Sequence, residues 1–305
     1  MGDENFQGCG VARRVSGGRQ LPDHALKVYV QEKRPVSRLG DALVPRRLTL
    51  PDGTVVETDV EAIGRVKPHG ASDRVRPFWP GVGISHAAGT TGTLGLLVRR
   101  KDDPSALYLL SCAHVLAAEG IGRRGDGIYQ PGVDQNPVHG GNAIAVLEEA
   151  IPFDYSPYGH NTPADAAIAR ILERSSAQSA LRGRDAPPLG PGTVRRDKRV
   201  TIYGVMSSGR EGIIKDIDYT PHFCFRHPDR PGLHRVGFRN HIMCGGIGEN
   251  ADRGISKDGD SGAALLDADG RVLGVVCGGS PARTIASRIA PILRLLRIDI
   301  VTDKV

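Results

Sequence analysis

Residues 258–266 read DGDSGAALL, and this stretch carries the strongest indication of the fold. Glycines surround Ser261, and the apolar run Ala263–Leu266 follows with the length and composition of a buried strand. Glycine allows backbone conformations that residues with a Cβ avoid, so the segment can turn sharply. The stretch therefore predicts a tight turn that opens a strand and presents a serine hydroxyl.

Two other segments place reactive side chains beside apolar strands. In LLSCAHVLA, residues 109–117, a strand runs into His114, and in ADAAIARI, residues 164–171, Asp165 opens a strand. A serine hydroxyl is a poor nucleophile unless an imidazole takes its proton and a carboxylate orients that imidazole. Taken in this chain order, His114, Asp165 and Ser261 are our predicted catalytic triad.

The turn around the serine meets a second chemical requirement. In acyl transfer the substrate carbonyl oxygen becomes an oxyanion, which needs two N–H donors aimed at one point. Because Gly259 has no Cβ, the amides of Gly259 and Ser261 are free to converge there. We therefore expect these two amides to form an oxyanion hole, in which one donor stabilises the transition state by about 3 kcal/mol.

The composition favours a soluble, mainly β protein. The chain has 305 residues with 40 glycines and 21 prolines, and short apolar runs alternate with turn residues from about residue 81. The net charge of +6 is scattered and aromatic residues make up only 5%, which argues against nucleic acid as a partner. Since no apolar run approaches the length of a membrane span, we expect protein or peptide partners and no membrane. The oligomeric state is not indicated.

The chain divides into two predicted domains. Residues 1–75 are expected to form a small N-terminal accessory domain of α/β or β type, and residues 76–305 the larger domain. Residues 67–80 are rich in proline, arginine and glycine and predict a linker. Two sets of short strands and a terminal helix predict two packed antiparallel β-barrels. The expected bounds are about 81–172 for barrel one, 198–286 for barrel two and 287–298 for the C-terminal helix.

The cysteines do not suggest a disulfide framework. They are Cys9, Cys112, Cys224, Cys244 and Cys277. Their number is odd, no compact spacing repeats, and the N-terminal sequence MGDENFQGCG has no apolar leader. We therefore expect reduced thiols and a cytoplasmic location.

One segment is rich in potential metal ligands. It contains His222, Cys224, His227, His234, His241 and Cys244. Zinc sites commonly show ligand pairs at short spacing, such as C-x-x-C, and this segment has irregular spacing. We therefore expect no metal and no other cofactor, and we interpret the segment as a long loop of barrel two near the cleft.

The histidine, aspartate and GDSG segments together resemble the motifs of the trypsin/chymotrypsin superfamily over about residues 81–300. The chain is similar to bacterial trypsin-like peptidases that carry a small N-terminal domain and are related to the plant NARROW LEAF 1 protease. That similarity includes ETDVEAIG at 57–64, GTTGTLG at 89–95 and GVMSSGREG at 204–212. The resemblance implies a two-barrel, chymotrypsin-like fold with the triad in the cleft between the barrels. It also implies peptide-bond hydrolysis through an acyl-enzyme, without a cofactor.

Some positions depart from the superfamily pattern. Ala263 replaces the usual second glycine after GDSG, and Cys112 precedes His114 where relatives have a cysteine after the histidine. No Ile-Val-Gly-Gly activation site stands before residue 81, so no new N-terminus is available to pair with Asp260. We therefore expect Asp260 to find another partner and activity to be independent of such a cleavage.

The resemblance also places the S1 pocket, which receives the substrate residue before the scissile bond (P1). Its walls would be formed by Ile255, by Cys277, Gly278, Gly279 and Ser280, and by Thr284. No aspartate stands at the pocket base, which argues against a preference for arginine or lysine. Ile255 and Thr284 would narrow the slot, so the sequence favours small or medium apolar P1 residues.

Other functions fit the sequence less well. An α/β-hydrolase needs the G-x-S-x-G elbow and the chain order serine, acid, histidine, and Ala263 and the observed order contradict both. Asp154 is a rival for the acid, but tyrosine and proline surround it rather than an apolar strand. Cys112 fits the nucleophile less well than Ser261 does. The remaining alternative is a non-catalytic protein-binding module that retains the protease fold.

Overall fold

The computed structural model describes residues 5–16, 19–62, 73–133, 143–156, 159 and 161–305. The part of the expected linker before residue 73 lies outside these ranges. The chain forms two compact units, residues 1–70 and 71–305. Within the described ranges, no helix is both long and apolar enough to cross a bilayer.

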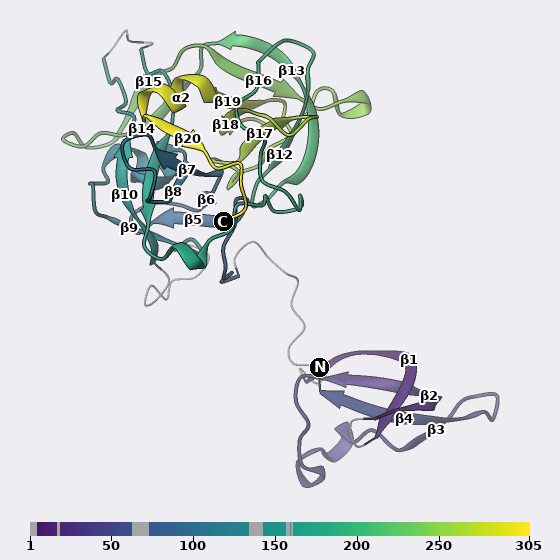
Figure 1. The fold of residues 1–305 in the computed structure, drawn as a ribbon. Coiled ribbons are helices and arrows are strands. Elements are labelled where there is room, and N and C mark those ends of the chain that lie inside the picture. The colour runs from purple at the N-terminus through teal and green to yellow at the C-terminus, as the bar shows by residue number, and fades with distance from the viewer. Residues whose placement is uncertain (1–4, 17–18, 63–72, 134–142, 157–158, 160) are drawn as a thin grey trace. The chain divides into compact units, whose positions relative to one another are not determined.

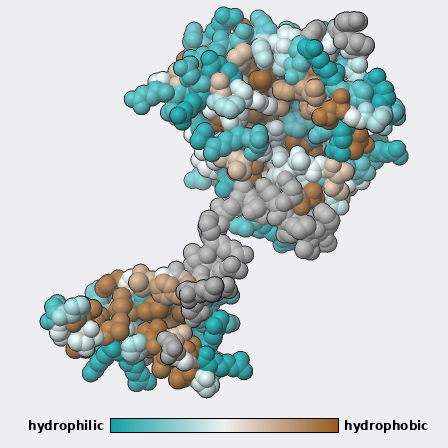
Figure 2. Space-filling model, turned by 180° about the vertical axis from the view of Figure 1, so that it is seen from behind, coloured by the Kyte–Doolittle hydropathy of each residue, from teal (hydrophilic) through white to brown (hydrophobic). Residues whose placement is uncertain are grey.

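The N-terminal unit is a twisted sheet with the strand order β1-β2-β4-β3 (Figure 1). Strands β1 and β2 pair antiparallel, β2 and β4 pair parallel, and β3 joins the edge through a turn at residues 50–54. The strands are β1 Phe6–Ser16, β2 Arg19–Val30, β3 Arg47–Thr49 and β4 Val55–Ala62, with short 3-10 helices at Val36–Arg38 and Gly40–Ala42. Figure 2 shows hydrophobic side chains gathered on one face of this unit.

The larger unit contains two antiparallel β systems. The first, barrel one, is an eight-stranded sheet with the order β20-β7-β8-β11-β10-β9-β5-β6. Its strands are β5 Gly83–His86, β6 Gly92–Thr93, β7 Leu96–Arg100, β8 Tyr108–Ser111, β9 Gly127–Tyr129, β10 Ala143–Ala150, β11 Ala167–Ile171 and β20 Ile298–Ile300. Apolar side chains such as Leu96, Leu109 and Ile168 are completely buried inside it. Burial of this apolar surface is the main source of its stability.

The second system, barrel two, is a closed barrel in the order β12-β13-β16-β19-β18-β17. Its strands are β12 Arg199–Tyr203, β13 Ser208–Tyr219, β16 His241–Gly245, β17 Ala264–Asp267, β18 Val272–Gly279 and β19 Thr284–Arg288. Between β13 and β16 the chain leaves the barrel and forms a separate hairpin, β14 His222–Arg226 and β15 Leu233–Gly237. The expectation of a mainly β protein with two antiparallel barrels is confirmed.

The C-terminal helix is present but shorter than expected. Helix α2 covers Ile289–Leu295, whereas the sequence predicted 287–298. Ser287 and Arg288 complete β19, and Arg297 takes a left-handed conformation with φ of 52°, which ends the helical geometry. The apolar residues that follow belong to β20, which pairs with β7 of barrel one. The apolar residues at helical spacing therefore belong to three elements, the end of β19, helix α2 and the start of β20, and the sequence had predicted them as one helix.

Candidate active site

His114 lies in a single helical turn that follows a strand of barrel one. Strand β8 ends at Ser111, and α1, Ala113–Leu116, begins after Cys112. The ring Nδ1 of His114 lies 2.5 Å from Oδ2 of Asp165, and the backbone N–H of His114 donates to Oδ1 at 3.1 Å. A carboxylate only accepts hydrogen bonds, so Nδ1 carries the proton and Nε2 keeps its lone pair. This is the tautomer that a general base requires.

Asp165 is fully buried just before β11, and a polar chain extends behind it. Its backbone N–H donates to Oγ of Ser287 at 3.0 Å, and that hydroxyl lies 2.9 Å from Nε2 of His241. Nδ1 of His241 must donate to the carbonyl of Arg239, so the Ser287 hydroxyl donates to Nε2. Burial lowers the pKa of His241 to about 4, which keeps this ring neutral near pH 7. Ser287 and His241 were not found from the sequence.

The electrostatics of His114 reflect two opposing causes. Burial alone would lower the pKa of its imidazole, because a low-dielectric surrounding disfavours the charged form. The charge of Asp165 and its hydrogen bond to the ring outweigh burial, so the pKa of His114 is raised above its ordinary value. The Asp165 carboxylate thus makes the ring a stronger base and stabilises its protonated form.

Ser261 is brought to this place by bonds between its turn and barrel one. The N–H of Thr93 donates to the carbonyl of Ser261 at 2.7 Å. The carbonyl of Val276 accepts from the N–H of Gly262 at 2.7 Å and from Sγ of Cys112 at 3.1 Å. One carbonyl therefore links the residue after the serine to the segment that leads into α1.

Ser261 and Val115, the residue after His114, both lie against Gly92. A Cβ added at Gly92 would lie 2.4 Å from Cγ2 of Val115 and 2.7 Å from the carbonyl oxygen of Ser261, so both residues crowd one glycine. Among the hydrogen bonds of the described residues, none joins Ser261 Oγ to Nε2 of His114. In ligand-free active sites such bonds are often long and tighten only when substrate binds.

The turn before Ser261 has the features of an anion site. Gly259 has a φ of 97°, a conformation that favours glycine. In the described part of the chain, the N–H groups of Gly259 and Ser261 donate no hydrogen bond, although those of Asp260 and Gly262 do. The carbonyl of Gly259 is held by Oγ1 of Thr93 at 2.8 Å. Two unpaired amides on either side of Asp260 are the donors that an oxyanion needs.

The side chain of Asp260 stabilises the turn before Ser261. Its side chain is fully buried and accepts from the backbone N–H of Met206 at 2.8 Å, of Ser207 at 3.0 Å and of Lys257 at 2.8 Å. Each bond to a carboxylate is stronger than a neutral one. The prediction that Asp260 finds a partner other than a newly cut N-terminus is confirmed.

The β14–β15 hairpin adds an aromatic wall that sequence reasoning missed. The ring of Phe225 stacks on the imidazole of His114 with centroids 5.6 Å apart and planes at 15°. A Cβ on Gly278 would lie 2.9 Å from Phe223, so this ring packs on the strand beside the pocket. The sequence HFCFR, with aromatic residues at alternate positions, was the available signal. Phe225 restricts the rotation of the imidazole by its contact.

A pocket of about 350 Å³ opens next to Ser261. It is lined by Ser256, Lys257, Asp258, Ser261, Val276, Gly278, Gly279, Ser280 and Pro281. Of the expected S1 residues, Gly278, Gly279 and Ser280 line it, but Ile255, Cys277 and Thr284 do not. The side chain of Ile255 packs in the core of barrel two, against the backbone of Gly212. Cys277 is 3% exposed and Thr284 is fully buried.

Among the histidines and cysteines of residues 222–244, His227 and His234 approach each other with ring centroids 5.3 Å apart, but no three of these residues bring ligand atoms together in the described ranges. Within the described ranges, the only group of three possible metal-ligand atoms belongs to Cys112, His114 and Asp165, with all atoms within 4.8 Å of one another. The His114–Asp165 hydrogen bond already uses two of them. Burial, followed by the charge of Asp165, raises the pKa of the Cys112 thiol well above its ordinary value, so the thiolate that a metal prefers is disfavoured. This donor set fits catalysis better than metal binding.

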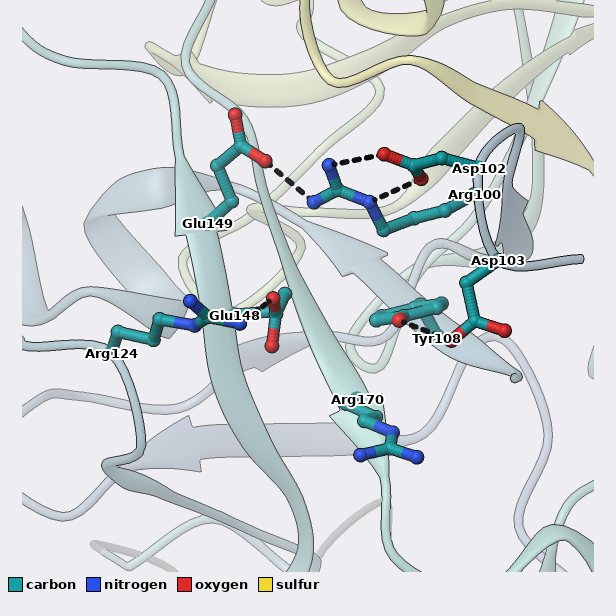
Figure 3. A pocket seen from close by; sticks show the side chains of 8 residues that line it. All are labelled: Arg100, Asp102, Asp103, Tyr108, Arg124, Glu148, Glu149 and Arg170. Atoms are coloured by element: carbon teal, nitrogen blue, oxygen red, sulfur yellow. Dashed lines mark hydrogen bonds and ion pairs between the residues drawn. The ribbon is translucent and has the colours of Figure 1, made fainter. Parts of the chain in front are cut away.

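A larger cavity of about 560 Å³ lies on barrel one (Figure 3). Its charged side chains largely satisfy one another: Arg100 is paired with Asp102 and Glu149, and Arg124 is paired with Glu148. The charge and hydrogen bond of Asp102, with the help of Glu149, hold the pKa of Arg100 above its ordinary value. This site contains neither a nucleophile nor a histidine, so it is a network of surface ion pairs.

Comparisons with known proteins support the fold. No family model and no curated protein matches the sequence. Among solved structures, a Nocardiopsis protease is 16% identical with a TM-score of 0.51, covering 73% of this chain and 98% of its own. The fold is chymotrypsin-like. Thermobifida fusca protease A (16% identity, TM-score 0.49, covering 73% and 98%) and Cellulomonas bogoriensis chymotrypsin (18%, 0.47, 74% and 100%) also match.

Proposed function

We propose that this chymotrypsin-like chain is a serine endopeptidase that hydrolyses peptide bonds through an acyl-enzyme. The proposal is supported by the His114–Asp165 pair, which leaves Nε2 of His114 free to act as a base, together with the two unpaired amides of Gly259 and Ser261 in the turn that holds the serine. A base and an anion site on either side of one serine are the minimum that acyl transfer needs.

The proposed first half-reaction begins with proton transfer. Nε2 of His114 takes the proton of Ser261 Oγ as that oxygen attacks the peptide carbonyl carbon. The carbonyl oxygen becomes an oxyanion, which accepts hydrogen bonds from the N–H groups of Gly259 and Ser261. Asp165 stabilises the imidazolium that has formed. His114 then gives its proton to the leaving amine, the C–N bond breaks, and an ester to Ser261 remains.

The second half-reaction repeats these roles with water. His114 takes a proton from water, the resulting oxygen nucleophile attacks the ester carbonyl, and the same two amides hold the second oxyanion. Collapse of this intermediate breaks the bond to Ser261 Oγ, which recovers its proton from His114. The products are a free carboxyl group and an unchanged enzyme, and no cofactor takes part.

The alternative is a protein-binding module that keeps this fold without catalysis. It draws on one observation, the lack of a hydrogen bond between Ser261 and His114 in the described part of the chain. Labelling with a fluorophosphonate, which reacts with activated serines, separates the two functions. We expect labelling of the wild type and loss of it in Ser261→Ala and His114→Ala. An unlabelled wild type that is fully folded would support the binding module.

Three further parts of the proposal concern relatives, domains and location. We propose a relation to the bacterial peptidases similar to NARROW LEAF 1, supported by the glycine signature at 89–95. Residues 1–75 would act as an accessory domain for recruitment or regulation of the protease at 76–305. A cytoplasmic location agrees with five unpaired cysteines, three of them buried. Cleaved termini compared between wild-type and Ser261→Ala cells would identify the protein substrates.

A further inference from the structure

Ser256, which lines the pocket beside Ser261, is hydrogen-bonded to the buried Thr284, and the donors and acceptors of this hydroxyl pair can be assigned. Oγ1 of Thr284 lies 2.9 Å from the N–H of Ile255, 2.9 Å from the N–H of Ser256 and 2.8 Å from Oγ of Ser256. Both amides can only donate, so they occupy both lone pairs of Thr284 Oγ1. The proton of Thr284 must therefore go to Ser256 Oγ.

This assignment leaves Ser256 with unused hydrogen-bonding capacity. Its oxygen accepts once, from Thr284, and so keeps its own proton and one lone pair. Ser256 has no other side-chain partner among the described residues, and it lines the pocket together with Gly279. A Cβ on Gly279 would come within 3.2 Å of Ser256 Oγ, so a larger residue at this position would crowd the hydroxyl.

The pocket wall carries opposite charges on adjacent residues. Lys257 and Asp258 both line the pocket and both are exposed. A charged substrate side chain would be attracted by one of these residues and repelled by the other, so the pair gives neither a cationic nor an anionic side chain a net attraction. A neutral group with one acceptor and one donor needs no counter-charge and can use both the proton and the lone pair of Ser256.

We infer that this pocket selects a carboxamide side chain, glutamine or asparagine, as the P1 residue of the substrate. The inference rests on the proposed peptidase function and replaces the apolar preference expected from the sequence, because Ile255 does not reach the pocket. Ser256 is the specificity-determining residue, and Thr284 is a positioning residue that orients the Ser256 hydroxyl. One buried or half-buried hydrogen bond corresponds to roughly tenfold in rate.

The test compares matched peptides that differ only at P1. Glutamine is compared with methionine and asparagine with leucine, since each pair has similar size but only the first member has an amide. Glutamate and lysine test the two charges. We expect the better carboxamide peptide to show a kcat/KM about tenfold or more above those of the methionine, leucine, glutamate and lysine peptides.

Variants assign that preference to the hydroxyl pair. Ser256→Ala should lower kcat/KM for the carboxamide peptide by about tenfold and leave the methionine peptide unchanged. Thr284→Ser keeps the hydroxyl and should keep the preference. A protein that reacts with fluorophosphonate but cleaves another P1 residue faster, cleaves none of the peptides, or loses all peptides equally in Ser256→Ala overturns the inference alone. A folded protein that does not react with fluorophosphonate overturns the proposed function, and the inference with it.

Discussion

Replacing Asp165 by asparagine tests the hydrogen bonds around His114 most directly. Both carboxylate oxygens of Asp165 accept from His114, one from the ring and one from the backbone N–H. An amide has one acceptor oxygen and one donor nitrogen, so it can satisfy only one of these two N–H groups. If the oxygen keeps the backbone bond, the amide nitrogen donates to the ring and forces the other tautomer, in which Nε2 carries the proton.

That tautomer cannot accept the proton of Ser261, so the loss is in the chemical step. We expect Asp165→Asn to lower kcat by about 10⁴-fold near pH 7. This corresponds to about 5 kcal/mol of transition-state stabilisation. The rate of fluorophosphonate labelling should fall similarly, while thermal unfolding should still show a folded protein because the volume is preserved.

Asp154→Asn is the matched control, since Asp154 was the rival acid in the sequence. Its carboxylate accepts from the N–H of Ser156, within its own loop, and no histidine of the described residues bonds to it. We expect this variant to keep wild-type kcat. Retention of more than a tenth of the wild-type rate by Asp165→Asn, or an equal loss in both variants, would refute the assigned tautomer.

Three other predictions follow from features of the site. Burial lowers the pKa of His241 from about 6.5 in the unfolded chain to about 4, so the unfolded chain binds more protons than the folded protein between these pH values. The free energy of unfolding should therefore fall by about 3 kcal/mol as the pH drops from 6.5 to 4, and urea titrations of His241→Gln should show a weaker dependence of that free energy on pH. Gly259→Ala would force a Cβ into a φ of 97° and to 3.0 Å from Met206, so kcat should fall by about 10²- to 10³-fold, whereas Gly209→Ala, at a φ of 72° with open space around it, should keep its kcat. Phe225→Leu removes the stacked ring and should lower kcat by roughly tenfold, since such aromatic contacts contribute about 0.5–1.5 kcal/mol; Phe225→Tyr should restore most of that rate, and equal rates in both variants would contradict a role for stacking.

The sequence predicted the parts of the site that rest on local pattern. DGDSG requires a tight turn because Gly259 and Gly262 both take positive φ values, and the apolar run after it is the buried strand β17. His114 could be placed because an apolar strand leads directly into it. Such signals lie within about ten residues and need no knowledge of tertiary contacts.

The parts that the sequence did not predict depend on pairing between distant segments. Ser287 and His241 meet Asp165 only because β16 and β19 are neighbours in barrel two, and nothing in their own segments marks them as polar support. Phe225 reaches His114 because a hairpin leaves the barrel and returns. Ile255 was assigned to the pocket from the family resemblance, but its side chain packs in the core of barrel two.

The pairing of β20 with β7 has a consequence for synthesis on the ribosome. Residues 96–100 of β7 emerge early, but their neighbour at 298–300 is made about two hundred residues later. At translation rates of roughly 5–20 residues per second, the edge of β7 that pairs with β20 keeps its backbone N–H and C=O groups exposed for about 10–40 s. During this time the unpaired edge of β7, in the barrel that contains His114, is available to chaperones or to wrong pairing with other polypeptides. Chains that end before residue 298 should keep this unpaired edge permanently.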